Sequence, residues 1–224
     1  MYIYHHLGLG DHIICNGLVR HFAEIHKSIK LFCHPHYKEN VEYMYRDDKN
    51  ITLIPIEESK IPLFLDNFKV EYIKTGFEKL KSYEKSGMTF DEAFYDIADL
   101  NFKIRFDKFY IQRDEELEQK ALVSMNPSGE DYIYVHDAPE RGFKIDATKY
   151  RQDLKVLTNN YDYNLFNLRK ILENATEIHS MQTGMLDFCN SIVLEKPKIF
   201  VHRYVRNYGD FVLSKGINKI NLIS

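Results

Sequence analysis

The sequence has 224 residues, which is enough for one α/β domain or two small ones with a buried core. Thirty Lys and Arg against 33 Asp and Glu give a net charge of -3, which argues against a nucleic-acid-binding surface. No stretch approaches the roughly 20 apolar residues of a transmembrane helix, and no signal-peptide pattern opens the chain. Its three cysteines lie far apart in apolar surroundings, so we expect reduced thiols and a cytoplasmic protein.

The chain opens with a short apolar strand, a glycine-containing loop and a helix. Gly8 and Gly10 allow a tight turn and the close approach of a ligand, and Asp11 stands where a helix N-cap belongs. Apolar residues then recur at helical spacing, at Ile13, Ile14, Leu18 and Phe22. This pattern predicts the first strand and helix of a Rossmann-like parallel sheet.

Strands and helices continue to alternate through the first half of the chain. We expect strands at residues 29–34, 51–56 and 69–73, and helices at residues 37–45, 89–100 and 113–122. Thr89 is the expected N-cap of its helix, with Asp91 and Glu92 in the first turn. Pro, Gly and small polar residues gather at residues 124–130, so we divide the chain there, into domains at residues 1–125 and 126–224.

The alternation restarts in the second half, which predicts a second, smaller α/β domain. Strands are expected at residues 131–136, 154–157, 176–180 and 198–202, and helices at residues 164–173 and 183–194. The predicted fold is therefore two Rossmann-like domains, each with a parallel sheet, facing a cleft.

The glycine loop departs from the common nucleotide-binding motifs. Ile13 stands where a dinucleotide fingerprint has its third glycine, and no Gly-Lys-Ser/Thr follows as in a P-loop. Gly-Leu-Gly-Asp instead resembles the N-terminal Leu-Gly-Asp loop of heptosyltransferase-like (family 9-like) glycosyltransferases of the GT-B fold. This resemblance implies that Asp11 is the general base; the alternative is that Asp11 only caps its helix. The residues expected to contact the acceptor flank this loop: His5, His6, Gly8, Gly10 and His12.

A second strand, loop and helix at residues 177–192 has the geometry to hold a diphosphate at the start of the helix. It resembles the Asp-Ser-Gly-Pro-Met-His-Leu-Ala element that binds the donor pyrophosphate in the same family. Gln182, Thr183 and Gly184 match Asp-Ser-Gly, and Asp187 falls on the histidine. Because the acid and the histidine are replaced, the backbone amides remain as the diphosphate-binding groups. The alternative is an ordinary connection capped by Thr183.

Basic residues follow two further strands of the second half. Arg141 and Lys144 lie in a loop that resembles the basic donor-binding loop of GT-B transferases, and Arg203 follows the strand at residues 198–202. Ligands bind outside the carboxyl ends of strands in open α/β sheets, which places all three at the expected edge. The expected donor-binding residues are His136, Arg141, Lys144, Ser180, Gln182, Thr183, Gly184, Asp187 and Arg203.

The resemblance implies a metal-independent, inverting glycosyltransferase that needs no cofactor. Its partners would be a nucleotide-diphosphate sugar, as co-substrate, and a glycan or other hydroxyl acceptor. One alternative is a noncatalytic nucleotide- or glycan-binding protein of the same fold. Another is a metal-dependent hydrolase built on the histidines, including His34 and His36; no metal site is expected, because their spacing matches no specific metal motif.

Overall fold

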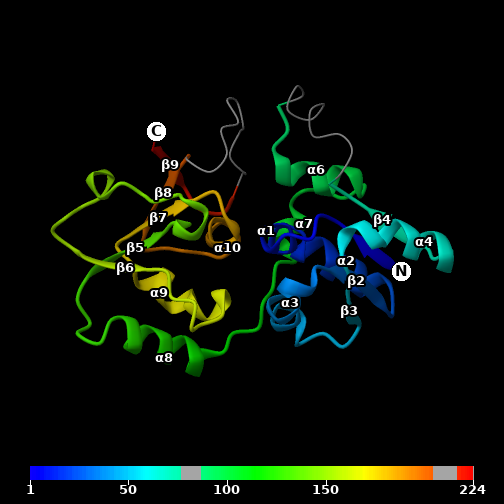
Figure 1. The fold of residues 1–224 in the computed structure, drawn as a ribbon, viewed down its shortest axis with the longest axis horizontal. Coiled ribbons are helices and arrows are strands. Elements are labelled where there is room, and N and C mark those ends of the chain that lie inside the picture. The colour runs from blue at the N-terminus through cyan, green and yellow to red at the C-terminus, as the bar shows by residue number, and fades with distance from the viewer. Residues whose placement is uncertain (77–86, 204–215, 224) are drawn as a thin grey trace. The chain divides into compact units, whose positions relative to one another are not determined.

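The computed structural model describes residues 1–76, 87–203 and 216–223 (Figure 1). The chain divides into two compact units, and among the described residues the first is 1–76 with 87–112 and the second is 113–203 with 216–223. Each unit has its own parallel sheet, as the sequence predicts. No helix in these ranges has the length and apolar character needed to cross a membrane.

The first unit contains a four-stranded sheet in the order β3-β2-β1-β4, with every pair parallel. Its strands are β1 (Tyr2–Tyr4), β2 (Ile29–Cys33), β3 (Ile51–Pro55) and β4 (Tyr72–Lys74). Its α-helices are α1 (Leu9–Ile14), α2 (Asn16–Ile25), α3 (Lys38–Tyr45), α4 (Ile61–Phe68), α6 (Phe90–Ile97) and α7 (Ile104–Asp107). Short 3-10 helices lie at Pro35–Tyr37 and Glu58–Lys60.

α6 begins where the sequence predicts. The Thr89 side chain accepts a hydrogen bond from the Glu92 backbone, and the Glu92 carboxylate accepts one from the Thr89 backbone, 2.8 Å away. This capping box satisfies two of the N–H groups that a helix start leaves without partners.

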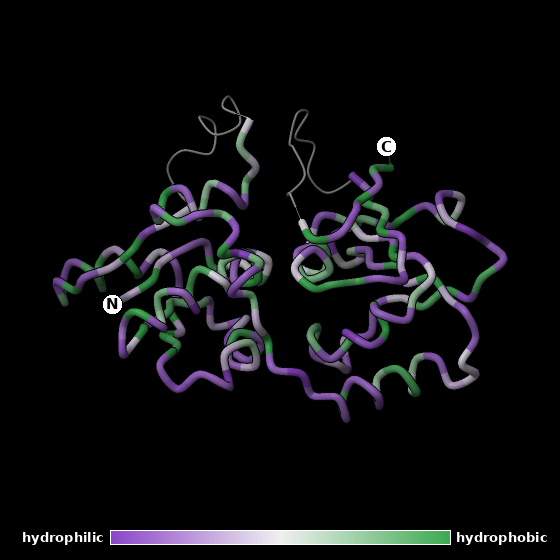
Figure 2. The backbone as a smooth tube through the Cα atoms, turned by 180° about the vertical axis from the view of Figure 1, so that it is seen from behind, coloured by the Kyte–Doolittle hydropathy of each residue, from purple (hydrophilic) through white to green (hydrophobic). Residues whose placement is uncertain are grey.

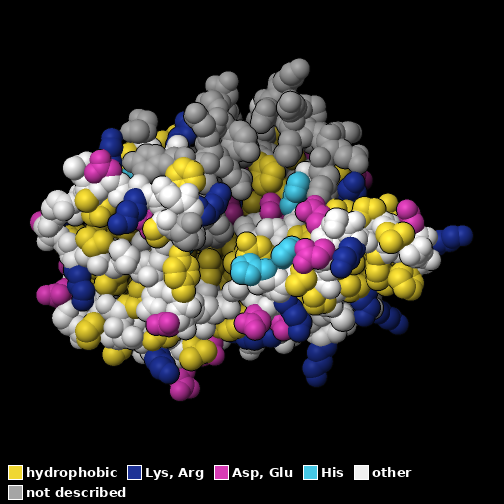
Figure 3. All heavy atoms as spheres, in the orientation of Figure 1, with side chains coloured by type: hydrophobic (Ala, Val, Ile, Leu, Met, Phe, Trp, Pro, Cys, Tyr) yellow, Lys and Arg dark blue, Asp and Glu magenta, His cyan; other side chains and the backbone are white. Residues whose placement is uncertain are grey.

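α4 is a helix that the sequence analysis does not predict. It has Pro62 in its first turn, buries Ile61 and Leu65, and ends at Lys69, whose backbone is left-handed (φ 47°). Leu63 and Phe68 are 65% and 64% exposed, and Figure 3 shows hydrophobic side chains at the surface over this end of the first unit. The helix therefore buries a narrow stripe and leaves much of its apolar surface to solvent.

The second unit contains a five-stranded parallel sheet in the order β6-β5-β7-β8-β9. Its strands are β5 (Tyr132–His136), β6 (Lys155–Thr158), β7 (Glu177–Met181), β8 (Lys198–His202) and β9 (Ile220–Ile223). Its α-helices are α8 (Glu115–Met125), α9 (Arg169–Asn174) and α10 (Gly184–Ser191). The 3-10 helices are Pro139–Arg141, Ala147–Lys149 and Leu165–Leu168. The sequence pattern predicts neither β9 nor α7.

The two faces of the second sheet are covered by different segments. Ile133, Val135 and Met181 pack against residues 138–154 on one face. On the other face the Tyr132 hydroxyl donates to the Ile171 carbonyl of α9, 2.8 Å away. Successive side chains of a strand alternate between faces, so His136 lies on the α9 face and Val135 on the opposite one.

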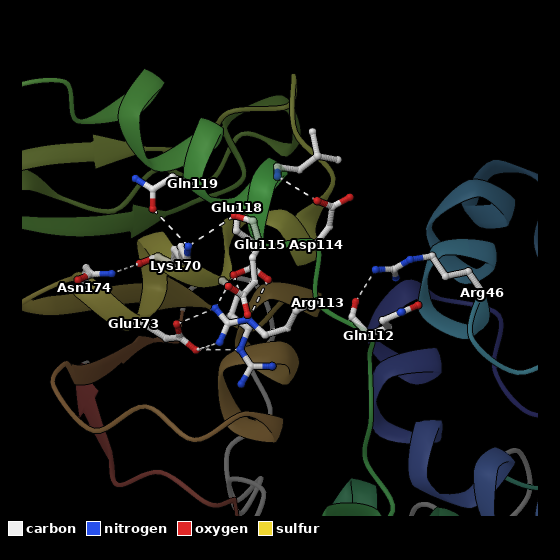
Figure 4. A network of polar contacts seen from close by, with 12 residues as sticks. Arg46, Gln112, Arg113, Asp114, Glu115, Glu118, Gln119, Lys170, Glu173 and Asn174 are labelled. Carbon is white, nitrogen blue, oxygen red and sulfur yellow. Dashed lines mark hydrogen bonds and ion pairs between the residues drawn. The ribbon is translucent and has the colours of Figure 1, made fainter.

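α8 is fastened to the second unit by a cluster of charged side chains (Figure 4). The Arg113 guanidinium contacts the Glu118 carboxylate and lies 2.9 Å from that of Glu173, which also pairs with Arg169 at 2.9 Å. Hydrophobic and hydrophilic residues alternate along α8 in Figure 2, and Glu118 and Ala121 are its buried members. The boundary expected between residues 125 and 126 thus stands at the end of a helix that belongs to the second unit.

Candidate functional site

The loop between β1 and α1 carries Asp11. α1 begins at Leu9 with Gly8 as its N-cap, so Asp11 lies inside the first turn, and the expectation that it occupies the N-cap is wrong. A carboxylate is favoured there because the first N–H groups of a helix carry partial positive charge. A Cβ atom on Gly8 would lie 2.6 Å from Oδ2 of Asp11, so the carboxyl group lies against this glycine.

The two glycines of this loop differ in backbone conformation. Gly8 is extended (φ -68°, ψ 150°), and Gly10 is the second residue of α1. Neither is among the described glycines with positive φ, so the chain turns here without a left-handed residue. What Gly8 supplies is the missing side chain, which leaves room for the carboxyl group of Asp11.

The histidines that flank the loop lie at different depths. His5 and His12 are fully buried, with ring centroids 4.5 Å apart and ring planes at 77°. His6 is partly exposed, and its Nε2 lies 2.7 Å from the carbonyl oxygen of Gly76. Of the three histidines among the five expected acceptor contacts, only His6 has exposed surface, and Gly8 and Gly10 are partly exposed as well.

Burial keeps the two inner histidines neutral. It lowers the pKa of His5 to about 4 and that of His12 well below its usual value, and His5 and His12 are close enough for like charge to oppose protonation of His12. Nε2 of His5 and both ring nitrogens of His12 have no hydrogen-bond partner within the described ranges. These rings pack as aromatic surfaces beneath the loop.

A buried tyrosine fixes the junction between α1 and α2. The Tyr95 hydroxyl donates to the Ile14 carbonyl at 2.8 Å and accepts from the Leu18 backbone N–H at 3.3 Å. It therefore satisfies backbone groups that the break at Cys15 frees. The sequence gives no sign of this role, because an aromatic residue in an apolar helix is expected to serve packing alone.

A buried ion pair lies behind the same junction. Arg105 and Asp91 are in contact, fully buried and 2% exposed respectively, and the Thr89 hydroxyl donates to Asp91 at 2.6 Å. α7 comes close enough to α2 that a Cβ on Gly17 would lie 2.4 Å from the Ile104 carbonyl oxygen. The sequence gives no sign of this pair, because the partners are separated in sequence and Arg and Asp side chains are usually exposed.

The loop after β7 leads into α10, where the diphosphate is expected. Ser180 is fully buried and its hydroxyl donates to the Met181 carbonyl at 2.9 Å, so it is occupied within the strand end. Thr183 is the N-cap of α10, and its side chain makes no capping hydrogen bond. Oγ1 of Thr183 and Oε1 of Gln182 are buried with no hydrogen-bond partner among the described residues. Asp187 lies in the first turn of this helix, starting at Gly184, and adds negative charge near it.

The loop after β5 carries the expected basic residues. A 3-10 turn ends at Gly142 (φ 79°), and reciprocal backbone hydrogen bonds of 3.1 Å between Ala138 and Phe143 close the loop. Arg141 and Lys144 are both exposed on it. Because both side chains are exposed, neither is desolvated in the folded protein, and both can contact an anion from solvent.

Strand pairing brings these elements to one edge of the second sheet. His136 and Ser180 are partners across β5 and β7, and Met181 pairs with His202, which precedes Arg203. The connection after β5 covers one face of the sheet, whereas α9 and α10 cover the other. Such a reversal marks the point where α/β sheets bind ligands. The expected donor-binding residues thus share one sheet edge, and Asp11 lies in the other unit.

Three titratable side chains that the sequence analysis did not propose for a site lie beneath this edge. His179 Nδ1 is 3.0 Å from His202 Nε2, and His179 Nε2 is 3.3 Å from the Glu177 carboxylate. Burial lowers the pKa of His179 and brings that of His202 to about 4. Glu177 and His179 stand two positions apart on β7, so their side chains face the same side of this buried strand. That spacing was the sign of the cluster in the sequence.

The histidines of the metal hypothesis make ordinary contacts. His34 Nε2 lies 3.1 Å from the Glu57 carboxylate, and His34 Nδ1 accepts from the His36 backbone at 3.2 Å. In the part of the chain that the structure describes, no three His, Cys, Asp or Glu side chains are grouped as metal ligands would be.

No protein-family model matches the sequence, and no curated protein matches it. Among solved structures, the chain is similar to a glycosyl transferase family 9 protein from Veillonella parvula DSM 2008. The TM-score is 0.57 with 10% sequence identity, and the likeness covers 99% of this chain and 85% of that chain. At this identity the likeness concerns the fold, and it confirms the predicted α/β architecture of two parallel sheets.

Proposed function

We propose that this protein transfers a sugar from a nucleotide-diphosphate sugar to a hydroxyl acceptor such as a glycan. The observation that carries the proposal is the fold likeness to a glycosyl transferase family 9 protein over 99% of the chain. The Gly-Leu-Gly-Asp loop supports it, because the acid stands in the first turn after the first strand. The free, buried cysteines suit the cytoplasmic location that we propose with it.

The second unit would bind the donor at the carboxyl edge of its sheet. Backbone N–H groups at the start of α10 would receive the diphosphate, where the helix dipole favours negative charge. Exposed Arg141 and Lys144 would neutralise the charge that grows on the leaving diphosphate, which makes the transfer metal-independent in this scheme.

The first unit would supply the base. Asp11 would accept the proton of the acceptor hydroxyl while that oxygen forms a bond to the anomeric carbon. The bond from that carbon to the diphosphate oxygen would break on the opposite side, and the diphosphate would leave with the electron pair. A single displacement of this kind inverts the configuration.

The Asp11→Asn variant tests the base. An amide cannot take the proton, so we expect sugar transfer to fall by at least about a hundredfold while nucleotide binding stays unchanged. Asp66→Asn, an exposed acid on α4 of the same unit, is the matched control. Transfer would be followed by nucleoside diphosphate release and binding by calorimetry. Wild-type turnover in Asp11→Asn would rule out this role for Asp11.

A noncatalytic nucleotide-binding protein of the same fold is the second candidate. It is favoured by Gln182 and Asp187, which replace the acid and histidine of the family element that this loop resembles. Such a protein would bind nucleotide sugars without consuming them. Tight binding with neither transfer nor hydrolysis, across donors and acceptors, would favour this candidate.

A further inference from the structure

The loop after β6, residues 159–164, has the composition of a binding surface. Its sequence is Asn-Asn-Tyr-Asp-Tyr-Asn, and it follows the carboxyl end of β6, the strand next to β5. Tyrosine offers a rigid, amphipathic ring and asparagine adaptable hydrogen bonds, which is why both are frequent in binding loops. Tyr161 is 75% exposed, the largest exposed fraction among the large apolar side chains of the described residues.

Hydrogen bonds hold this loop in place around Asn159. The Asn159 amide nitrogen donates to the Asp137 carbonyl at 2.8 Å and to the Tyr161 hydroxyl at 3.2 Å. The Asp162 backbone donates to the Asn160 side chain at 2.9 Å. The Tyr161 hydroxyl is thus held by Asn159, which is itself bonded to the loop after β5, while Tyr161 is mostly exposed. Little ordering is therefore needed for a flat ligand to stack on its ring.

Two buried oxygens beside this loop lack partners. Oδ1 of Asn159 and the hydroxyl of Tyr134 have no hydrogen-bond partner within the described residues, and Tyr134 is fully buried. Burial, Cys189 and Tyr161 all raise the pKa of Tyr134, which puts its hydroxyl within electrostatic reach of Tyr161. Buried polar groups are nearly always hydrogen-bonded, so the oxygen of the partly exposed Asn159 suits a ligand that brings an N–H group, whereas the Tyr134 hydroxyl lies too deep to meet one.

The distance to the diphosphate region suits a nucleotide. β6 and β7 flank β5, and neighbouring strands lie about 4.8 Å apart, so the β6 and β7 ends are about 10 Å apart. A nucleoside diphosphate with its phosphates at the start of α10 would therefore have its ribose over β5 and its base near residues 159–164.

We propose that the 159–164 loop is the base-binding subsite of the donor site, where the Tyr161 ring stacks on the nucleobase and Asn159 Oδ1 accepts an N–H from its edge. This inference rests on the proposed function, because it takes the donor to be a nucleoside diphosphate derivative. It assigns recognition of the nucleobase to the carboxyl end of β6, two strands away from β7 and the diphosphate region.

The test compares ligands with and without a base on the full chain. Wild type, Tyr161→Ala and Tyr161→Phe are titrated by calorimetry with UDP, GDP, ADP, CDP and inorganic pyrophosphate. Tyr72→Ala, an exposed tyrosine on β4 of the first unit, is the matched control. Because Tyr161 is mostly exposed, the variants keep the wild-type fold, which circular dichroism checks.

We expect Tyr161→Ala to weaken the tightest-binding nucleoside diphosphate about tenfold or more and to leave pyrophosphate affinity unchanged. Tyr161→Phe keeps the ring and most of the affinity, and Tyr72→Ala matches wild type. Unchanged nucleotide affinity in Tyr161→Ala, or an equal loss for pyrophosphate, overturns the base subsite while the proposed function stands. If wild type binds none of these ligands, the donor site of the proposed function fails as well.

Discussion

At the scale of single residues, the buried histidines of the first unit connect the fold to pH. His5 and His12 are neutral in the folded chain because burial penalises the imidazolium form. In the unfolded chain both titrate near pH 6.5. The unfolded state therefore binds more protons below that pH, and acid favours unfolding.

We predict that the contribution of His5 and His12 to the free energy of unfolding is constant above about pH 6.5 and falls as the pH drops toward 4. Each of the two histidines contributes about 1.4 kcal/mol per pH unit at the steepest part of this range. Urea unfolding at pH 7.5, 6.0 and 5.0 measures the slope. His12→Phe keeps a ring beside His5 and removes one proton site, so its slope is smaller.

His36→Gln, which replaces an exposed histidine, is the control for this experiment. An equal slope in wild type and His12→Phe would mean that His12 is not held neutral by the fold. Sequence alone singled out His5 and His12 for their closeness to the glycine loop. It could not predict their burial, because depth depends on helices that arrive from distant parts of the chain.

At the scale of elements, the Asn218 side chain joins the segment before β9 to the end of α10. The Asn218 amide nitrogen donates to the carbonyls of Cys189 and Ile192 at 2.6 and 2.7 Å, and its oxygen accepts from the Leu194 backbone at 3.2 Å. These bonds satisfy carbonyls that the helix end leaves without intrahelical partners. Asn218 thus acts as a C-terminal cap supplied from a distant segment.

Asn218→Ala removes these three hydrogen bonds, and we predict a loss of about 2 kcal/mol in the free energy of unfolding. Asn67→Ala, at an exposed position on α4, changes it by less than about 0.5 kcal/mol. Urea titration followed by circular dichroism measures both. A loss no larger than that of the control would show that water replaces Asn218 at the helix end.

Element identity follows the local pattern where that pattern is strong. The apolar runs of β2, β5 and β7 and the Thr89 capping box are visible in the sequence and confirmed. β9 was missed because four residues near the end of the chain give little periodicity, and its place beside β8 is set by pairing. α4 was missed because Pro62 reads as a breaker, although proline is well suited to a first helical turn.

At the scale of the whole molecule, the chain first passes from one unit to the other between Gln112 and Arg113. The Gln112 carbonyl accepts a hydrogen bond from Arg46 of the first unit, whereas Arg113 pairs with Glu118 and Glu173 of the second. The glycine- and proline-rich residues 124–130 look like a linker in sequence. They are a turn inside the second unit. The sequence does not indicate this, because the charged residues of α8 give no sign that the helix packs against the second unit.

We predict that a fragment of residues 113–224 folds, whereas one of residues 126–224 does not. The shorter fragment lacks α8 and leaves Glu173 without Arg113. Far-UV circular dichroism and the cooperativity of thermal unfolding distinguish the two. Equal stability of both fragments would mean that the second unit folds without α8 and that its boundary lies between residues 125 and 126.

The contact between Gly8 and Asp11 has a consequence for how such chains diverge. Any side chain at position 8 would meet the Asp11 carboxylate at 2.6 Å, so the acid would have to rotate away from its present place. A lineage that acquires Ala or Ser at position 8 would therefore hold the Asp11 carboxylate in a different place. Among descendants of a common ancestor we expect these two positions to change together, and a retained glycine would mark the members in which the acid keeps its present position.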